Sequence, residues 1–540
     1  MAEHKLWWKN GIIYQIYPRS FQDTNGDGIG DLEGIIQHLD YLQDLGIDGI
    51  WLSPINPSPD VDFGYDISDY HTIDPKFGNL QDFEHLLQEA HKRDLHIIMD
   101  LVLSHSSDQH RWFQESRKSV DNPYHDWYVW RDPAPEGGKP NNWVSIFGGD
   151  AWEYDENLGQ YYYHMFNKHQ PDLNWHNPEV RSTMLDVFRY WLDKGVDGFR
   201  LDVFNNYFQD KLFRDNPKKE GLSFRSLVRK FDAYDHIYDS NQPEMIELVE
   251  DIRKIVDSYP ERYVVGETFL VDSAQARTYI GPKGLYAGFD YAFCNSPFNA
   301  RAYGKAIQYW DALHGENNWP NYFFNNHDTP RSTTRFAKGE SDAIPKLLLA
   351  MQLTVRGTPY LYYGEEIGMR DINLARSQIQ DPVGKRYWSF NKGRDGCRSP
   401  MQWNSKLNAG FTTGEPWLPV NKDYPVRNLA SQSASPASLL SFYKQMIKLR
   451  QAYPALNAGN LEMIQAENED LLVYQRQAGD QKMLIILNFS KEINNYPLQT
   501  DNFNRWELLF AGNESITSQM AESDVHLPGY GFAILISRSE

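Results

Sequence analysis

The chain has 540 residues and a net charge of -20, and it is 41% hydrophobic and 14% aromatic. This length exceeds that of one ordinary domain, and the apolar content excludes a disordered chain because it suffices for a large buried core. The acidic balance, without any run of Lys and Arg, disfavours a nucleic-acid partner.

The first twenty residues lack the uninterrupted apolar stretch of a secretory signal, and no apolar run of about 18 residues follows them. Cys294 and Cys397 are the only cysteines, and their distance in sequence gives no metal-ligand motif or disulfide framework. We therefore expect a cytoplasmic protein with no membrane partner.

Residues 23–31 read DTNGDGIGD, with oxygen-bearing side chains at alternate positions. This spacing is how a short loop wraps ligands around a hard cation such as calcium. The twelfth position of the loop is Gly34, where the ordinary calcium-binding hand has a chelating carboxylate. An ordinary turn is the alternative, since Asp, Asn and Gly favour turns for backbone reasons.

Eight short apolar runs of strand length alternate with helix-period segments such as 32–46 and 80–94. The alternation predicts an α/β fold, a closed (β/α)8 TIM barrel of parallel strands. An open, doubly wound sheet would show the same alternation. The expected strands begin at Ile12, Gly49, Leu95, Gly198, Tyr263, Gly288, Tyr322 and Tyr360.

Two segments depart from this alternation. About 70 residues rich in Trp, Tyr, Asn, Pro and Gly follow the third strand, which predicts an inserted subdomain. After the helical pattern that ends near residue 456, short alternating strands predict a C-terminal antiparallel β-sandwich domain. The expected bounds are 1–105 and 176–458 for the barrel, 106–175 for the insert and 459–540 for the C-terminal domain.

Charged residues follow several of the expected strands, where a barrel builds its active site. Three carboxyl groups that share a cavity suit acid-base and nucleophilic chemistry, and glycoside hydrolysis needs such a set. A metal site that includes the two histidines is an alternative, although it lacks the spacing of known zinc motifs. A second alternative is that the charged residues form ordinary salt bridges at the strand ends. The charged residues that follow the expected strands are Asp100, His105, Arg200, Asp202, Glu267, His327 and Asp328.

Five motifs stand in the order DLVLSH from Asp100, QPDLN from Gln170, GFRLD from Gly198, VGET from Val265 and NNHD from Asn325. With them the chain resembles glycoside hydrolase family 13, the α-amylase family, and its α-glucosidase and oligo-1,6-glucosidase branch. The resemblance implies a retaining double displacement. Its catalytic residues are then Asp202 as nucleophile, Glu267 as general acid and base, and Asp328 as transition-state stabiliser.

The resemblance also implies a substrate pocket that is closed at the non-reducing end by Asp62, Tyr65 and Arg394, the arginine pairing with the aspartate. Such a pocket admits only a chain end and so favours exo-acting hydrolysis of small α-glucosides, with no organic cofactor. The other substrate-binding residues that it implies are His105, Phe147, Phe166, Arg200, Val203 and His327.

In this branch, the loop after the first strand carries a structural Ca2+ or Mg2+. The resemblance therefore assigns the metal ligands to Asp23, Asn25, Asp27 and Asp31, with the carbonyl of Ile29. Ser104 replaces the asparagine that helps bind the calcium of true amylases, so we expect no second metal site. We expect a monomer or a homodimer.

The residues that indicate which glycosidic linkage is cleaved give conflicting predictions. Val203 resembles the valine of oligo-1,6-glucosidases, whereas Phe63 and residues 205–217 resemble the α-1,4-acting branch. The predicted function is an exo-acting α-glucosidase with some transglucosylation. The alternatives are an oligo-1,6-glucosidase proper and a transglucosidase of the sucrose isomerase or trehalose synthase type. An inactive binding relative, such as an amino-acid transporter heavy chain, is disfavoured because the three catalytic carboxyl groups are present.

Overall fold

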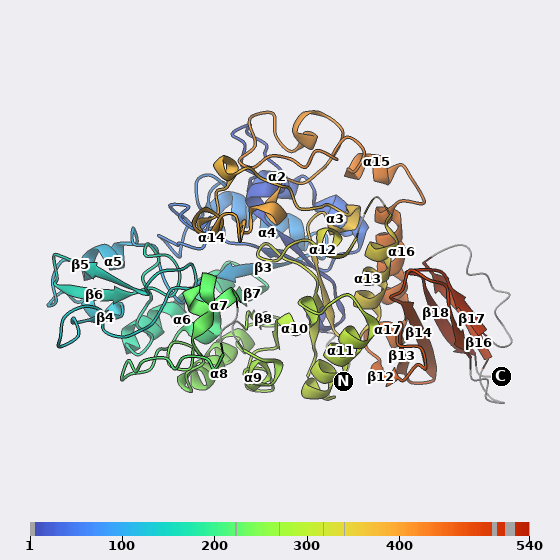
Figure 1. Ribbon diagram of the computed structural model, residues 1–540. Coiled ribbons are helices and arrows are strands. Elements are labelled where there is room, and N and C mark those ends of the chain that lie inside the picture. Colours follow the sequence, from blue (N-terminus) through green and yellow to red (C-terminus); the bar gives the residue numbers. More distant parts are fainter. Residues whose placement is uncertain are drawn as a thin grey trace.

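The computed structural model describes residues 6–221, 224–268, 271–316, 318–337, 339, 341–498, 505–512 and 524–538. Its centre is a sheet of eight parallel strands in the order β10-β11-β1-β2-β3-β7-β8-β9 (Figure 1). Neighbours follow chain order, and β11 returns to pair with β1, which confirms the barrel and excludes a doubly wound sheet. The strands are β1 Ile13–Ile16, β2 Gly49–Leu52, β3 His96–Leu101, β7 Gly198–Leu201, β8 Tyr263–Gly266, β9 Ala287–Gly288, β10 Asn321–Phe323 and β11 Thr358–Tyr362.

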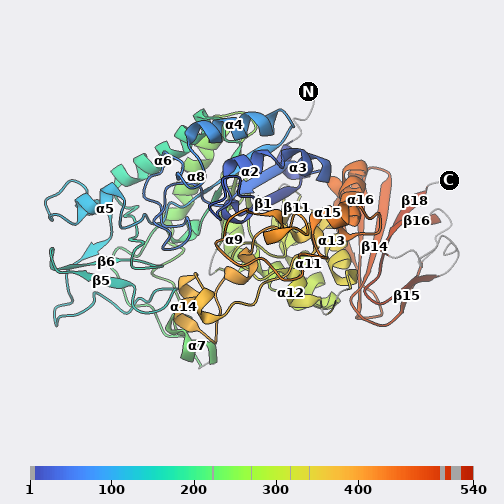
Figure 2. The ribbon, with the colours of Figure 1, turned by 90° about the horizontal axis from the view of Figure 1, so that it is seen from above.

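Helices surround these strands (Figures 1 and 2). The α4 helix shows why they form: Asn79 and Asp82 make a reciprocal cap at its start, and its apolar face is buried. The longer helices are α4 Leu80–His91, α6 Pro178–Asp193, α8 Glu244–Asp257, α11 Ala300–His314, α13 Ala343–Thr354 and α16 Leu439–Ala452. The shorter ones are α1 Trp7–Asn10, α2 Leu32–Ile36, α3 Leu39–Leu45, α5 Arg111–Ser116, α7 Phe224–Val228, α9 Ser273–Thr278, α10 Tyr291–Cys294, α12 Ser332–Phe336, α14 Pro382–Tyr387, α15 Leu429–Ser433 and α17 Pro454–Asn457.

Two predicted elements differ in detail. The helical pattern over 32–46 forms two helices, because His38 leaves helical geometry and stacks on Trp403 with ring centroids 3.6 Å apart. The strand predicted from Gly288 ends at that residue. Asp290 then accepts a hydrogen bond from the Ala292 N–H and starts α10, which places Tyr291 at the carboxyl end of the barrel.

The insert after β3 contains α5 and a three-stranded antiparallel sheet, and it lies on the side of the barrel opposite the C-terminal sheets (Figure 1). The sheet order is β4-β6-β5, with β4 Trp130–Arg131, β5 Trp152–Asp155 and β6 Gln160–Tyr163. That this subdomain spans residues 106–175 remains a prediction.

The C-terminal segment forms a five-stranded antiparallel sheet, β12-β13-β14-β18-β16, and a β15-β17 pair. Alternate residues of β13 face opposite ways: Leu472 and Tyr474 pack on the barrel core, while Leu471 and Val473 pack with Val525 of the small sheet. Along the described part of the chain, no helix is both long and apolar enough to cross a bilayer. The strands are β12 Asn460–Ile464, β13 Leu471–Ala478, β14 Gln481–Asn488, β15 Asn494–Pro497, β16 Arg505–Ala511, β17 Asp524–Leu527 and β18 Phe532–Arg538.

Candidate active site

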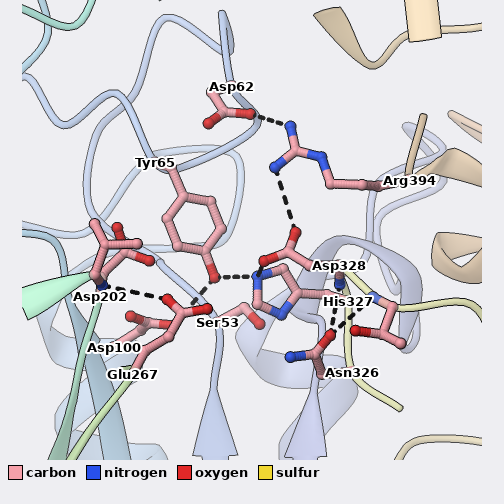
Figure 3. A network of polar contacts seen from close by, with 12 residues as sticks. Ser53, Asp62, Tyr65, Asp100, Asp202, Glu267, Asn326, His327, Asp328 and Arg394 are labelled. Atoms are coloured by element: carbon pink, nitrogen blue, oxygen red, sulfur yellow. Dashed lines mark hydrogen bonds and ion pairs between the residues drawn. The ribbon is translucent and has the colours of Figure 1, made fainter. Parts of the chain in front are cut away.

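Arg200, on β7, joins three carboxyl groups at the carboxyl ends of neighbouring strands. Its Nη1 donates to Asp100 Oδ1 at 2.8 Å and to Asp202 Oδ1 at 2.7 Å, and its Nη2 donates to Glu267 Oε2. The barrel ladder places these groups in a row, because the Asp202 N–H donates to the Leu101 carbonyl and the Glu267 N–H to the Leu201 carbonyl. Figure 3 shows the three carboxyl groups side by side.

One guanidinium cannot neutralise three carboxylates. Burial raises the pKa of Asp100 to about 6 and raises that of Asp202 well above its ordinary value, although Arg200 opposes both shifts. Asp100 and Asp202 therefore hold protons more readily than free carboxyl groups do, and a proton is kept between them at moderately acidic pH. This charge arrangement suits a reaction that needs both a carboxylate and a carboxylic acid.

Val203, directly after Asp202, has a left-handed backbone with φ of 31°. Such a conformation is strained for a β-branched residue and persists only where the surroundings hold it. Here the Val203 N–H donates to Glu267 Oε2 at 3.2 Å, and the side chain packs among buried apolar residues of the insert. The turn fixes the direction of Asp202 relative to Glu267.

A chain of hydrogen bonds links His327 to the row of carboxyl groups formed by Asp100, Asp202 and Glu267, which we call the carboxyl row (Figure 3). Gln15 Nε2 donates to His327 Nδ1 at 2.7 Å, so the ring proton is on Nε2, which lies 2.5 Å from Tyr65 Oη. Tyr65 Oη then donates to Asp100 Oδ2 at 3.1 Å. Burial lowers the pKa of His327 well below its usual value, so the ring is neutral and serves as a donor.

Asp328 lies among cations. Its Oδ1 accepts from Arg398 Nη2 at 2.8 Å and from Arg394 Nη1 at 3.3 Å. Burial opposes its ionisation, but His327 and the two arginines lower the pKa of Asp328 well below its usual range. Arg394 Nη2 also donates to Asp62 Oδ1 at 2.5 Å, so the expected Asp62–Arg394 pair is present, and the arginine bridges Asp62 and Asp328 (Figure 3).

These groups open onto a cavity of about 580 Å³. Its size fits a small ligand, and its wall combines aromatic rings with converging charged groups. Arg200 and His327 lie directly behind the wall, in contact with Asp202 and Tyr65 respectively. The structure thus brings all the expected catalytic and substrate-binding residues together. Those that line the cavity are Asp62, Tyr65, His105, Phe147, Phe166, Asp202, Val203, Glu267, Asp328 and Arg394.

The sequence reasoning missed several members of this site. Tyr291 Oη donates to Glu267 Oε1 at 2.5 Å, and its position just after β9 was a signal that could have found it. Asp381 accepts from Arg394 Nη2 at 2.7 Å. Asp381 and Arg398 come from the long segment after β11, where no strand marks them, so sequence pattern alone held no signal.

The expected metal loop is folded by its own carboxylates. Asp23 Oδ1 accepts from the Asn25 and Gly26 N–H groups, Asp27 Oδ1 accepts from the Ile29 N–H, and Asp31 Oδ1 accepts from the Gly34 N–H. The oxygen donors suit a hard cation in kind. Within the described ranges, however, no three His, Cys, Asp or Glu side chains are grouped as metal ligands. The metal stays a prediction.

Comparison with known proteins agrees with this site. A family model described as the alpha amylase catalytic domain matches residues 15–459, and one described as the maltogenic amylase C-terminal domain matches residues 461–534. A protein of Rhizobium meliloti (strain 1021) named probable alpha-glucosidase is 41% identical over 538 residues, which cover 97% of this chain and 96% of the relative.

The oligo-1,6-glucosidase of Heyndrickxia coagulans is 39% identical over 544 residues, covering 94% of this chain and 96% of that protein. The crystal structure of an alpha-glucosyl transfer enzyme is similar with a TM-score of 0.93 at 38% identity, covering 99% of this chain and 100% of that one. The barrel, the carboxyl row and these matches together mean that the chain belongs to the α-amylase family, glycoside hydrolase family 13, and is a glycoside hydrolase.

Proposed function

We propose that the protein is a retaining, exo-acting α-glucosidase that removes the terminal glucosyl unit of short α-glucosides, with some transfer to other acceptors. The contact that carries the proposal is the Arg200 bridge between Asp202 and Glu267, which holds two carboxyl groups on one cavity. The names of the relatives, α-glucosidase and oligo-1,6-glucosidase, support the substrate class.

In the proposed reaction, Asp202 attacks the anomeric carbon and forms a glucosyl ester while Glu267 gives a proton to the leaving oxygen. The ester removes the charge of Asp202, so Arg200 then faces only Asp100 and Glu267. Glu267 next takes a proton from water or an acceptor alcohol, whose oxygen attacks the anomeric carbon and displaces the Asp202 carboxylate. Asp328, which is held ionised, accepts hydrogen bonds from the ring hydroxyls and stabilises the positive transition state.

The cation bridge at one end of the cavity supports exo action. Arg394 holds Asp62, Asp328 and Asp381 together, so a glucan chain cannot continue past them. His105 lies on the same wall with a neutral ring, whose pKa burial lowers to about 4, and its Nε2 lies 2.9 Å from the Tyr65 carbonyl, so it holds Tyr65 against the cavity. The cavity therefore suits one terminal glucose.

The defining experiment measures initial glucose release from maltose and from isomaltose at equal concentration. We expect release from at least one of them, with the Asp202→Asn variant slower by several orders of magnitude, because an amide cannot form the glucosyl ester. A variant of near-normal rate would refute the nucleophile assignment. Faster maltose cleavage favours an α-1,4-acting enzyme, and faster isomaltose cleavage an oligo-1,6-glucosidase.

A transglucosidase is the second candidate, because the similar crystal structure is that of an alpha-glucosyl transfer enzyme. Disaccharide loss without matching glucose in the same assay would favour it.

We further propose a cytoplasmic monomer or homodimer that binds neither nucleic acid nor membrane. The buried free thiols of Cys294 and Cys397 support a reducing compartment. We also propose that the 23–31 loop binds Ca2+ or Mg2+ as a structural ion.

A further inference from the structure

Large apolar side chains are exposed on two segments beside the catalytic cavity. Phe224 and Leu227 of α7 are 72% and 69% exposed, and Phe390, just after α14, is 73% exposed. The rings of Phe224 and Phe390 lie 6.4 Å apart between centroids, at 56° to each other. Both views place α7 and α14 close together (Figures 1 and 2). We call Phe224, Leu227 and Phe390 the rim patch.

The rim patch is continuous with the cavity that holds Asp202 and Glu267. Arg225 and Asn391, the chain neighbours of Phe224 and Phe390, both line that cavity. The Arg225 side chain lines it while remaining 74% exposed, which places it at the opening. The two phenylalanines therefore stand at the mouth through which an aglycone leaves or an acceptor enters.

The wall between the carboxyl groups and the mouth changes in character. The deep end is charged, whereas Phe231, Val271 and Val383 contribute apolar side chains to the lining. The carboxylate nearest the rim patch is already paired, since Arg225 Nε and Arg229 Nε lie 3.2 Å and 3.7 Å from Asp232 Oδ2. A second sugar ring needs hydrogen-bond partners, whereas an alkyl or aryl group gains free energy from covering exposed apolar side chains.

We propose that the rim patch is a binding site for apolar aglycones and apolar acceptor alcohols. The enzyme then favours aryl α-glucosides and, among alkyl α-glucosides, those with longer chains. This inference rests on the proposed α-glucosidase activity. The glucosyl unit occupies the charged end, Glu267 protonates the glycosidic oxygen, and the aglycone then lies between Phe224 and Phe390.

The test compares kcat and KM for ethyl, butyl and hexyl α-glucosides in the wild type and in a Phe224→Ser/Phe390→Ser variant. The basicity of these leaving alcohols is nearly constant, so the chain-length effect falls on KM. We expect the wild-type KM to fall about twofold per added methylene, or about 16-fold from ethyl to hexyl, because the chain becomes partly buried. The double variant should lose most of this dependence.

Ile493→Ser is the matched control, since Ile493 is 74% exposed on the C-terminal domain and lies outside the cavity lining. It should keep the wild-type dependence on chain length. Equal dependence in the wild type and the double variant, or a wild-type KM that does not fall, would overturn the inference while maltose or isomaltose hydrolysis persists. Loss of glucose release from every α-glucoside would instead overturn the proposed function.

Discussion

At the scale of single residues, the expected catalytic carboxyl groups could be predicted from one rule, that the active site of a barrel lies just after its strands. Asp202, Glu267 and Asp328 were predictable because each follows a recognisable strand. Asp381 and Arg398 were not, because a residue between distant loops acquires its partners only when the chain has folded. The protonation of Asp202 also depends on the folded surroundings, because burial and the carboxyl groups of Glu267, Asp100 and Asp328 raise its pKa, although Arg200 opposes the shift.

Tyr291 offers a test of the row itself. Its hydroxyl donates to Glu267 Oε1, and Tyr291→Phe removes that donor while it leaves the ring. We expect kcat/KM to fall about tenfold, the effect of one hydrogen bond to a charged group, with little change in melting temperature. Steady-state kinetics with maltose or isomaltose would show this. An unchanged kcat/KM would mean that Tyr291 does not hold Glu267.

Glu365 lies behind the loop that carries His327 and Asp328, where its Oε2 accepts from Asn325 Nδ2 at 2.9 Å. Burial raises its pKa to about 7. The folded chain therefore binds more protons than the unfolded chain between about pH 4.5 and 7, and the free energy of unfolding falls as pH rises through that window. Glu365→Gln, which mimics the protonated acid, should remove this loss, about 3 kcal/mol at pH 8. Denaturant unfolding at pH 5 and pH 8 measures it, and an equal pH dependence in both proteins would contradict it.

At the scale of elements, hydrophobic periodicity located all eight barrel strands, but it gave their lengths poorly. A short strand such as β9 ends where a polar side chain captures the next backbone N–H, as Asp290 does, and apolar pattern does not report such caps. The loop at 23–31 shows the same limit. Its Asp and Asn spacing predicted both a turn and a cation site, and the hydrogen bonds of Asp23 show how the turn is built.

The loop can be tested as an element. Bound Ca2+ should stabilise the folded chain by mass action, so a chelator should lower the melting temperature by several degrees and added Ca2+ should restore it. Asp27→Ala should abolish the response to Ca2+, whereas Glu469→Ala, at an exposed position of the C-terminal domain, should keep it. A melting temperature that ignores both chelator and Ca2+ in the wild type would refute the metal proposal.

At the scale of the whole molecule, the C-terminal domain is joined to the barrel by a buried guanidinium. Arg476 of β13 donates to the carbonyls of Thr354, at the end of α13, and of Gly459 and Asn460. The domain was predictable from strand periodicity, but this joint was not, because a buried arginine that binds only carbonyls has no partner visible in sequence. Burial lowers its pKa to about 9, so it remains charged at neutral pH.

Arg476→Leu should leave these carbonyls without donors and lower the free energy of unfolding by about 3 kcal/mol. Lys491→Leu, which changes a largely exposed cation of the same domain, should change it by less than about 1 kcal/mol. Thermal unfolding monitored by circular dichroism compares the two variants. Equal melting temperatures would mean that Arg476 contributes little to the joint.

The ion pair between Asp62 and Arg394 has a consequence for synthesis of the protein. Its partners are 332 positions apart in the chain, and Arg398 follows four residues after the second of them. During translation Asp202, Glu267 and Asp328 all leave the ribosome before Arg394 and Arg398, which hold one end of the cavity together. A nascent chain that stops short of Arg394 therefore carries these three carboxyl groups without the arginine that bridges Asp62 and Asp328, and we expect activity only after the long loop that follows β11 has been made.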